Sequence, residues 1–257
     1  MTATMPHGAP AWADSVTEDF ERDLACYTAV FGWSPLGFGA EVEHYVDFHV
    51  GAPGDGGLAV AGLVGSAPGF LPGVPSRWTV YFRVPDCGAA VARATALGAG
   101  VVIGAAPVGE DLVYALLDDP SGAHFGLFEI RSDGAGFQTS GGTGAPVRFT
   151  FGAADLAASV DFYRRLFDWT VTGDEAQAAL TAAGAEAPFG DMRAGAPATG
   201  WVAYYGVDSV EEAVARANQH GGALVHGPSS ADGRLSAELA APSGARFGIA
   251  GPPTAGP

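Results

Sequence analysis

Lysine is absent from this chain of 257 residues, and all of its basic side chains are the 12 arginines, against 28 acidic residues. The formal net charge is therefore -16 at pH 7. A strongly acidic chain with no basic stripe is repelled by phosphate, which excludes nucleic acid as a partner and disfavours an anionic membrane. The same charge keeps a protein in solution and weakly attracts cationic small molecules.

Cysteine is nearly absent, since only Cys26 and Cys87 are present and neither lies in a CxxC or Cys-His spacing. This argues against a disulfide framework and a zinc knuckle. The opening has no basic start followed by an apolar stretch, so we expect no signal peptide. The longest uncharged stretch, "GGLAVAGLVGSAPGFLPGVPS", holds too much proline and glycine for a membrane-spanning helix. We therefore expect a cytoplasmic protein with no membrane partner.

The chain contains an internal repeat. "DFERDLACYTAVFGW" from Asp19 matches "DLAASVDFYRRLFDW" from Asp155, and "DPSGAHFGLFEI" matches "APSGARFGIAGP" later in the chain. Domain size and the repeat together predict a first domain over residues 8–131 and a second over residues 147–251. The Gly- and Ser-rich residues 132–146 between them have the composition of a flexible linker.

Within each half the order of elements also repeats. A short strand precedes a helix that begins near Asp19 or Asp155, and strand-like runs, a second helix and a strand-turn-strand segment follow. The first helix places Phe20, Leu24, Tyr27 and Phe31 on one predicted apolar stripe. The pattern predicts an α+β fold of four βαβββ modules, forming two domains whose mixed sheets curl around a cavity.

At this point the chain resembles a known family. The βαβββ order, the helix ends "YTAVFGW" and "YRRLFDW", and the turn-strands "DPSGAHFG" and "APSGARFG" are similar to those of the vicinal oxygen chelate superfamily. That superfamily includes glyoxalase I, extradiol dioxygenases, fosfomycin-resistance enzymes and bleomycin-resistance proteins. The resemblance covers both halves and is nearest to two-domain, glyoxalase-like actinobacterial proteins, some of which belong to anthracycline and other aromatic polyketide pathways.

The resemblance also implies where a metal would bind. Metal-dependent members use a His or Gln at the start of a module's first strand and a Glu in its last strand. The matching positions here are Trp12, Arg148, Trp78 or its neighbour Thr79, Trp201, Gly126 and Gly248. Tryptophan has no lone pair to donate, arginine is always cationic and glycine has no side chain. We therefore expect no metal site, and we expect no cofactor, because no Walker loop, GxSxG elbow or correctly placed GxGxxG occurs.

The cavity implied by the resemblance would remain without the metal. Residues two apart on a strand face the same side, so Trp12 and Asp14 are predicted to point into the first cavity, with His124 beside Gly126. The predicted ligand-binding residues are Trp12, Trp78, Tyr114, Arg148, Trp201, Glu238 and Arg246, with Thr150 beside them, and the predicted catalytic residues are Asp14 and His124.

Each of these residues also has a structural interpretation. The three indoles would serve equally well as hydrophobic packing of a closed core. Asp14 would be a solvated strand residue, His124 a surface histidine beside a turn, and Arg148 the partner of a neighbouring carboxylate.

Three functional hypotheses follow. The first is a metal-independent protein, monomeric or homodimeric, that binds an aromatic or amphipathic natural product for resistance or biosynthetic tailoring. The second is a metal-free enzyme that uses Asp14 or His124 as general acid or base on an aromatic metabolite. The third is a metal-dependent lyase, isomerase or dioxygenase whose ligands lie elsewhere in the chain.

Overall fold

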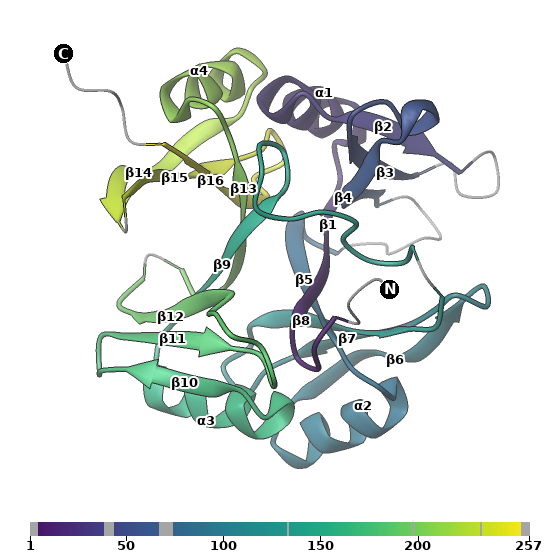
Figure 1. The fold of residues 1–257 in the computed structure, drawn as a ribbon, viewed down its shortest axis with the longest axis vertical. Helices are drawn as coiled ribbons and strands as arrows, with labels where there is room; N and C mark the ends of the chain where they lie inside the picture. Colours follow the sequence, from purple (N-terminus) through teal and green to yellow (C-terminus); the bar gives the residue numbers. More distant parts are fainter. Residues whose placement is uncertain are drawn as a thin grey trace. The chain divides into compact units, whose positions relative to one another are not determined.

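The computed structural model describes residues 5–38, 44–66, 74–132, 134–196, 198–231 and 233–252. Sixteen strands and four α-helices in these ranges follow the order strand, helix and three strands four times over, which confirms the predicted fold class (Figure 1). We call the four repeats modules 1 to 4.

Module 1 contains β1 (Pro10–Thr17), α1 (Phe20–Phe31), β2 (Ser34–Gly37), β3 (Tyr45–Val50), the 3-10 turn η2 (Pro53–Asp55) and β4 (Leu58–Gly65). Module 2 contains β5 (Arg77–Arg83), α2 (Cys87–Ala96), β6 (Gly100–Val108), β7 (Leu112–Asp118) and β8 (His124–Ile130). Module 3 contains β9 (Pro146–Ala153), α3 (Leu156–Phe167), β10 (Thr170–Gly173), β11 (Gln177–Thr181) and β12 (Gly190–Ala194). Module 4 contains β13 (Gly200–Gly206), α4 (Val210–Gln219), β14 (Ala223–Ala231), β15 (Arg234–Ala240) and β16 (Arg246–Gly251).

The strands form two mixed, open eight-stranded sheets, with the orders β2-β3-β4-β1-β5-β8-β7-β6 and β10-β11-β12-β9-β13-β16-β15-β14. In every module the last strand lies between the first strand, to which it is parallel, and the strand before it, to which it is antiparallel. A helical crossover between parallel strands explains this arrangement, because parallel neighbours cannot be joined by a tight turn. Each half of the chain therefore contributes one sheet of two modules.

The chain also divides into two compact units. Unit 1 comprises the described residues of Met1–Trp12, Thr79–Gly136 and Arg148–Trp201, and unit 2 comprises those of Ala13–Trp78, Phe137–Val147 and Val202–Pro257. Within unit 1 α2 packs beside α3, and within unit 2 α1 packs beside α4 (Figure 1). The domain boundaries predicted from the repeat, residues 8–131 and 147–251, stay a prediction. The compact units do not follow the two halves of the chain, because unit 1 holds α2 and α3 and unit 2 holds α1 and α4.

An aromatic core fills the helix side of each unit. In unit 1 the ring of Tyr163 on α3 lies 5.3 Å from Trp201, and Phe82 lies 5.1 Å from Phe167. In unit 2 the ring of Tyr27 on α1 lies 5.3 Å from Trp78 and 5.2 Å from Phe247. The Phe82–Phe167 pair is tilted and the other three are edge-to-face. Aromatic pairs at these separations add about 0.5–1.5 kcal/mol each beyond their buried area.

The first helix differs from its prediction. Tyr27 and Phe31 are buried as expected, but Phe20 and Leu24 are only partly buried, and the fully buried Asp23 takes part in the packed stripe. Its carboxylate accepts hydrogen bonds from the backbone N–H of Ser243, at 3.0 Å, and from its hydroxyl, at 2.5 Å. A hydrophobic stripe read from sequence misses this face because the partner is a polar turn far along the chain.

The segment predicted to be a flexible linker has defined partners in unit 2. The indole N–H of Trp33 donates to the carbonyl of Gly144 at 2.7 Å. The side-chain carbonyl of Gln138 accepts a hydrogen bond from the backbone N–H of Ala59 at 3.0 Å. From Phe137 onward this segment therefore belongs to unit 2, and glycine and serine composition alone did not indicate this.

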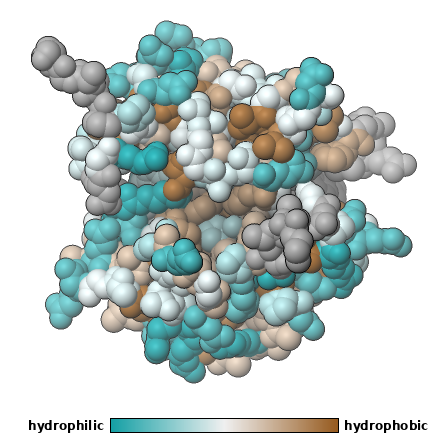
Figure 2. Space-filling model, viewed as in Figure 1, coloured by the Kyte–Doolittle hydropathy of each residue, from teal (hydrophilic) through white to brown (hydrophobic). Residues whose placement is uncertain are grey.

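Figure 2 shows hydrophilic and hydrophobic residues intermingled over the visible face. Among the described residues, no helix has both the length and the apolar character needed to span a bilayer.

Candidate active or ligand-binding faces

The indoles of Trp78 on β5 and Trp201 on β13 point toward the helices. The Trp78 indole N–H donates to the hydroxyl of Tyr27 on α1 at 2.8 Å, and the Trp201 N–H donates to the hydroxyl of Tyr163 on α3 at 3.0 Å. Burial raises the pKa of both phenols well above 10, so both hydroxyls stay neutral. This geometry favours the packing role for Trp78 and Trp201 over the predicted ligand-binding role.

Strand alternation then defines a second face. Because Trp78 and Phe82 face helices, Thr79 and Tyr81 lie on the opposite side of β5. In β1, Ser15 lies 3.3 Å from the Tyr27 hydroxyl, so the side chains of Trp12 and Asp14 lie on the side away from α1. We call the side of each module turned away from its helix the distal face.

Each module carries an equivalent set of three residues at the centre of its distal face. The three are in register across the first strand, the last strand and the strand next to it. The sets are Asp14, Gly62 and Asp47 in module 1, Tyr81, Gly126 and Leu116 in module 2, Thr150, Asp191 and Ala179 in module 3, and Tyr204, Gly248 and Glu238 in module 4. We call these sets the register triads.

In modules 2 and 4 a tyrosine ring covers the glycine of the triad. A Cβ atom added at Gly126 would fall inside contact distance of the Tyr81 ring, and one added at Gly248 would collide with the ring of Tyr204. Only a residue without a side chain permits this approach. Both rings are largely buried, with exposed fractions of 5% and 8%.

Module 2 places the predicted residues His124 and Tyr114 on its distal face. His124 precedes Gly126 by two residues, and its Nδ1 lies 2.8 Å from a carboxylate oxygen of Asp118. Tyr114 is half-buried and in register with Phe128, whose ring lies 4.4 Å from that of Tyr81. A carboxylate-bonded imidazole beside aromatic rings suits either proton transfer or ligand contact.

Module 4 brings the predicted residues Glu238 and Arg246 together. The Tyr204 hydroxyl donates to one carboxylate oxygen of Glu238 at 2.9 Å, and Arg246 forms an ion pair with the other. The side chains of Arg246 and Glu238 are 27% and 12% exposed. This cluster combines a ring with a partly accessible charged pair.

Module 1 has an acidic triad. Asp14 and Asp47 lie on either side of Gly62, and the Tyr45 hydroxyl donates to Asp47 at 2.9 Å. Desolvation raises the pKa of Asp47, against smaller opposing effects of the Tyr45 hydrogen bond and of the nearby His49. Trp12, two residues before Asp14, is only 5% exposed.

Module 3 holds a buried carboxylate at the position where the other modules have glycine. Asp191 is 3% exposed and is bonded by Arg148, Arg193 and Gln177. Arg148 thus has the carboxylate partner that its structural interpretation required. Thr150 lies beside Asp191 in register and is 7% exposed.

The Glyoxalase/Bleomycin resistance protein/Dioxygenase superfamily model matches residues 10–127 and 146–248. The chain belongs to this superfamily. It is 30% identical over 264 residues, with 95% of each chain covered, to CFP32 of Mycobacterium tuberculosis, described as a candidate glyoxylase. It is 28% identical over 274 residues, covering 97% of this chain and 94% of the relative, to the anthracycline biosynthesis protein DauV of Streptomyces sp. strain C5.

Solved structures of superfamily members share the fold. The Mn(II)-bound glyoxalase from Novosphingobium aromaticivorans has a TM-score of 0.66 at 15% identity, covering 96% of this chain and 83% of that one. The 2,3-dioxygenase LapB from Pseudomonas sp. KL28 has a TM-score of 0.64 at 15% identity, with coverages of 96% and 93%. At such identities the likeness shows the fold alone.

The donor set of the superfamily positions does not fit a divalent metal. Tyrosine rings fill the space over Gly126 and Gly248, where a ligand carboxylate would stand. Asp191 is the one acidic residue at the last-strand triad position, and guanidinium groups already occupy its oxygens. Within the described ranges, no three His, Cys, Asp or Glu side chains converge as metal ligands do.

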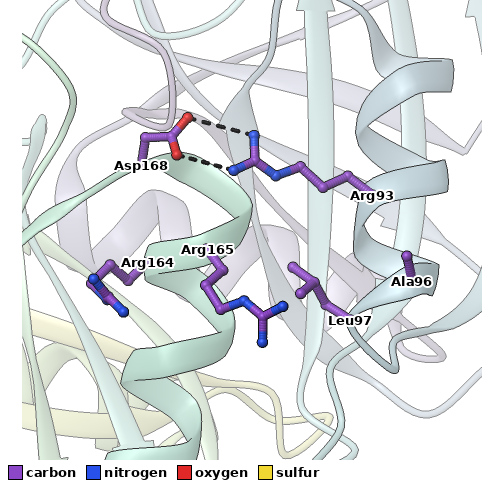
Figure 3. A pocket seen from close by; sticks show the side chains of 6 residues that line it. All are labelled: Arg93, Ala96, Leu97, Arg164, Arg165 and Asp168. Atoms are coloured by element: carbon purple, nitrogen blue, oxygen red, sulfur yellow. Dashed lines mark hydrogen bonds and ion pairs between the residues drawn. The ribbon is translucent and has the colours of Figure 1, made fainter.

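Two other features are poor candidates for a site. A depression of about 400 Å³ lies between α2 and α3 of unit 1 (Figure 3). Its Arg93 pairs with Asp168 at 3.0 Å, and its Arg164 and Arg165 both pair with Asp161, so carboxylates largely neutralise its cationic lining. The cysteines are unreactive thiols, because burial raises the pKa of Cys26 to about 11 and that of Cys87 to about 12.

Sequence reasoning missed the tyrosines of the triads. "WTVYF" and "WVAYY" place each tyrosine three residues after a tryptophan, and thus on the opposite face of the strand. Had the indoles been assigned to the core, Tyr81 and Tyr204 would have been the predicted distal residues. Asp47 and Asp191 carried no comparable signal, because only the sheet register brings them to the triads.

The ring-over-glycine contact predicts a mutational coupling. Gly126→Ala should destabilise the protein by about 1–3 kcal/mol, because the new methyl group meets the Tyr81 ring. The same change in a Tyr81→Ala background should cost less than half as much, as urea unfolding would show. Gly104→Ala is the matched control, since a Cβ at that strand position meets nothing within 4 Å. Equal costs of Gly126→Ala in both backgrounds would refute the contact.

Proposed function

We propose that this superfamily member binds an aromatic or amphipathic natural product without a metal, on the distal faces of modules 2 and 4. The proposal depends most on one observation: in both modules a tyrosine ring, of Tyr81 or Tyr204, occupies the space that a side chain at the last-strand glycine would need. A ring fixed over a glycine gives each face a rigid aromatic floor, and rigid surfaces bind with a smaller entropic cost.

Groups around each floor supply the remaining contacts. Tyr114 on module 2 and the Glu238–Arg246 pair on module 4 are partly exposed, so they reach a molecule lying over the tyrosine. Pockets for small molecules typically combine apolar walls with a few polar groups that fix orientation. Relatives named as anthracycline biosynthesis proteins support a planar polycyclic ligand and a role in biosynthetic tailoring or resistance.

The proposal predicts binding of a planar quinone. Isothermal titration with 1,4-dihydroxyanthraquinone in the presence of EDTA should give a Kd on the order of 1–100 µM. Tyr114→Ala should weaken binding about fivefold, because one aromatic contact contributes about 1 kcal/mol. Phe162→Leu, which changes an aromatic residue of the helix-side core, should leave the Kd unchanged. If the wild-type protein gives no heat of binding at about 100 µM quinone, the upper end of the expected Kd range, the proposal is contradicted.

A second candidate function is metal-free proton transfer. The observation that favours it is the 2.8 Å contact between His124 and Asp118, because a carboxylate that holds an imidazole nitrogen orients the ring as a general base. The His124 side chain is only 8% exposed. A ligand on the distal face of module 2 would cover this remaining area and shield the proton transfer from water. Asp14, on the acidic face of module 1, is the other sequence-predicted candidate for this role.

Solvent exchange tests this second function. A panel of polycyclic hydroxyketones in D2O should incorporate deuterium next to the carbonyl, measured by mass spectrometry, and His124→Gln should slow this by about 100-fold or more. Asp118→Asn should slow exchange and shift its pH profile, whereas His220→Gln, at the end of α4, should do neither. If His124→Gln exchanges at the wild-type rate while Asp14→Asn does not, the base is Asp14. Unchanged rates in both variants, or no exchange by the wild type, would exclude proton transfer by these residues.

A further inference from the structure

The Asp191 cluster of module 3 has more positive than negative charge. One carboxylate oxygen accepts hydrogen bonds from the Nε atom of Arg148, at 2.8 Å, and from its Nη2 atom. The other accepts from the side-chain amide of Gln177 at 3.0 Å and from Nε of Arg193 at 2.5 Å. All four residues lie in unit 1 and come from β9, β11 and β12.

The carboxylate is saturated while the arginines are not. An ionised carboxylate has about four acceptor positions, and these four hydrogen bonds use them. In the part of the chain that the structure describes, Arg193 donates to Asp191 through Nε, which leaves its two terminal Nη groups for another acceptor. No second carboxylate pairs with Arg148 or Arg193 within the described ranges.

Register places both arginines on the distal face. Arg148 and Thr150 are two apart on β9, Asp191 and Arg193 are two apart on β12, and Thr150 is in register with Asp191. The arginine side chains are 24% and 41% exposed, whereas Asp191 is almost fully buried. The buried carboxylate therefore holds two partly accessible guanidinium groups in fixed positions.

A purely structural role explains only part of this cluster. Burying one carboxylate calls for one compensating cation and hydrogen bonds to its remaining lone pairs, which Arg148 and Gln177 supply. The second guanidinium leaves an excess positive charge on this face of a chain whose net charge is -16. Arginine held in this way suits planar anionic oxygens and also stacks on aromatic rings.

We propose that Arg148 and Arg193 form a recognition site for an anionic oxygen, a carboxylate or phenolate, carried by an aromatic ligand. The site rests on the proposed function and extends it to the distal face of module 3. It also adds the class of ligand: an aromatic acid instead of a neutral ring. Asp191 and Gln177 are positioning residues, since they fix the guanidinium groups and do not contact the ligand.

Matched acid and amide probes test the site. Isothermal titration should show that 2-naphthoate binds wild-type protein about tenfold more tightly than the neutral 2-naphthamide, a difference of about 1.4 kcal/mol. Arg193→Gln should reduce this ratio to about threefold or less by weakening naphthoate binding, with naphthamide binding unchanged. Arg164→Gln, an exposed arginine of α3 with the same loss of charge, should keep the wild-type ratio.

The outcomes separate the two proposals. Arg193→Gln is the primary variant because Arg193 is the more exposed arginine and Arg148→Gln also removes a partner of a buried carboxylate. Equal affinities for acid and amide, or a ratio that survives in Arg193→Gln, would overturn the anion site and leave the proposed function standing. If Arg164→Gln lowered the acid-to-amide affinity ratio as much as Arg193→Gln, the preference for the acid would arise from net charge alone, and the anion site would also be overturned. Absence of binding by both probes would overturn the anion site, whereas the quinone titration decides the proposed function.

Discussion

The packing of a tyrosine ring over a glycine in the neighbouring parallel strand constrains the rest of the site. It occurs in modules 2 and 4, at positions related by the internal repeat. Each ring takes the volume that a longer side chain on the last strand would need, so the last strand cannot present a ligand carboxylate. Adding even a methyl group there would force the ring or the strand to move.

On β5 and β13, the strands that carry these tyrosines, the two faces differ in character. On the helix side, an indole N–H bonded to a buried phenol is repeated in Trp78 with Tyr27 and in Trp201 with Tyr163. These bonds satisfy polar atoms inside aromatic cores, where an unmade hydrogen bond would cost about 1–3 kcal/mol. The distal side carries the varied chemistry: acidic in module 1, aromatic with His124 in module 2, cationic in module 3 and mixed in module 4.

This variation among the triads is informative because their geometry is shared. Because the strand register is the same in all four modules, only the side chains differ, and each module shows which residue types the triad positions accommodate. Asp191 demonstrates that an acidic residue fits the last-strand position, but in this chain it binds guanidinium groups. The four modules therefore share one fold while their register triads carry different groups, and folds that serve many activities commonly vary in this way.

Much of the fold was predictable from the sequence. The repeat, the helix ends and the turn-strands led to four βαβββ modules, and the structure confirms that order. Period-two alternation also predicted that Asp14 shares a face with Trp12, and His124 a face with Gly126. The direction in which Trp78 points was not predictable, because alternation alone does not tell whether Trp78 or its neighbour Thr79 points toward the helix.

Contacts between segments far apart in the chain were also beyond sequence reasoning. Asp191 meets Arg148 only because β12 pairs in parallel with β9, and Asp23 meets Ser243 only because α1 packs in the same unit as β16. No local pattern encodes such pairings, since the polar residues involved would look solvated in any single segment. The partners of Gln138 and Gly144 in the predicted linker were hidden for the same reason.

We infer that the strand positions matched to the superfamily's metal ligands, Trp12, Arg148, Trp201, Gly126 and Gly248, supply no donor set for a divalent cation. Elemental analysis of untagged protein purified without chelator, followed by titration with Mn2+, Fe2+, Ni2+ and Zn2+, tests it most directly. We expect far less than one equivalent of any of these metals and no saturable binding at micromolar concentrations. One tightly bound equivalent that is lost on replacing Asp14, His124, Asp191 or Glu238 would contradict it.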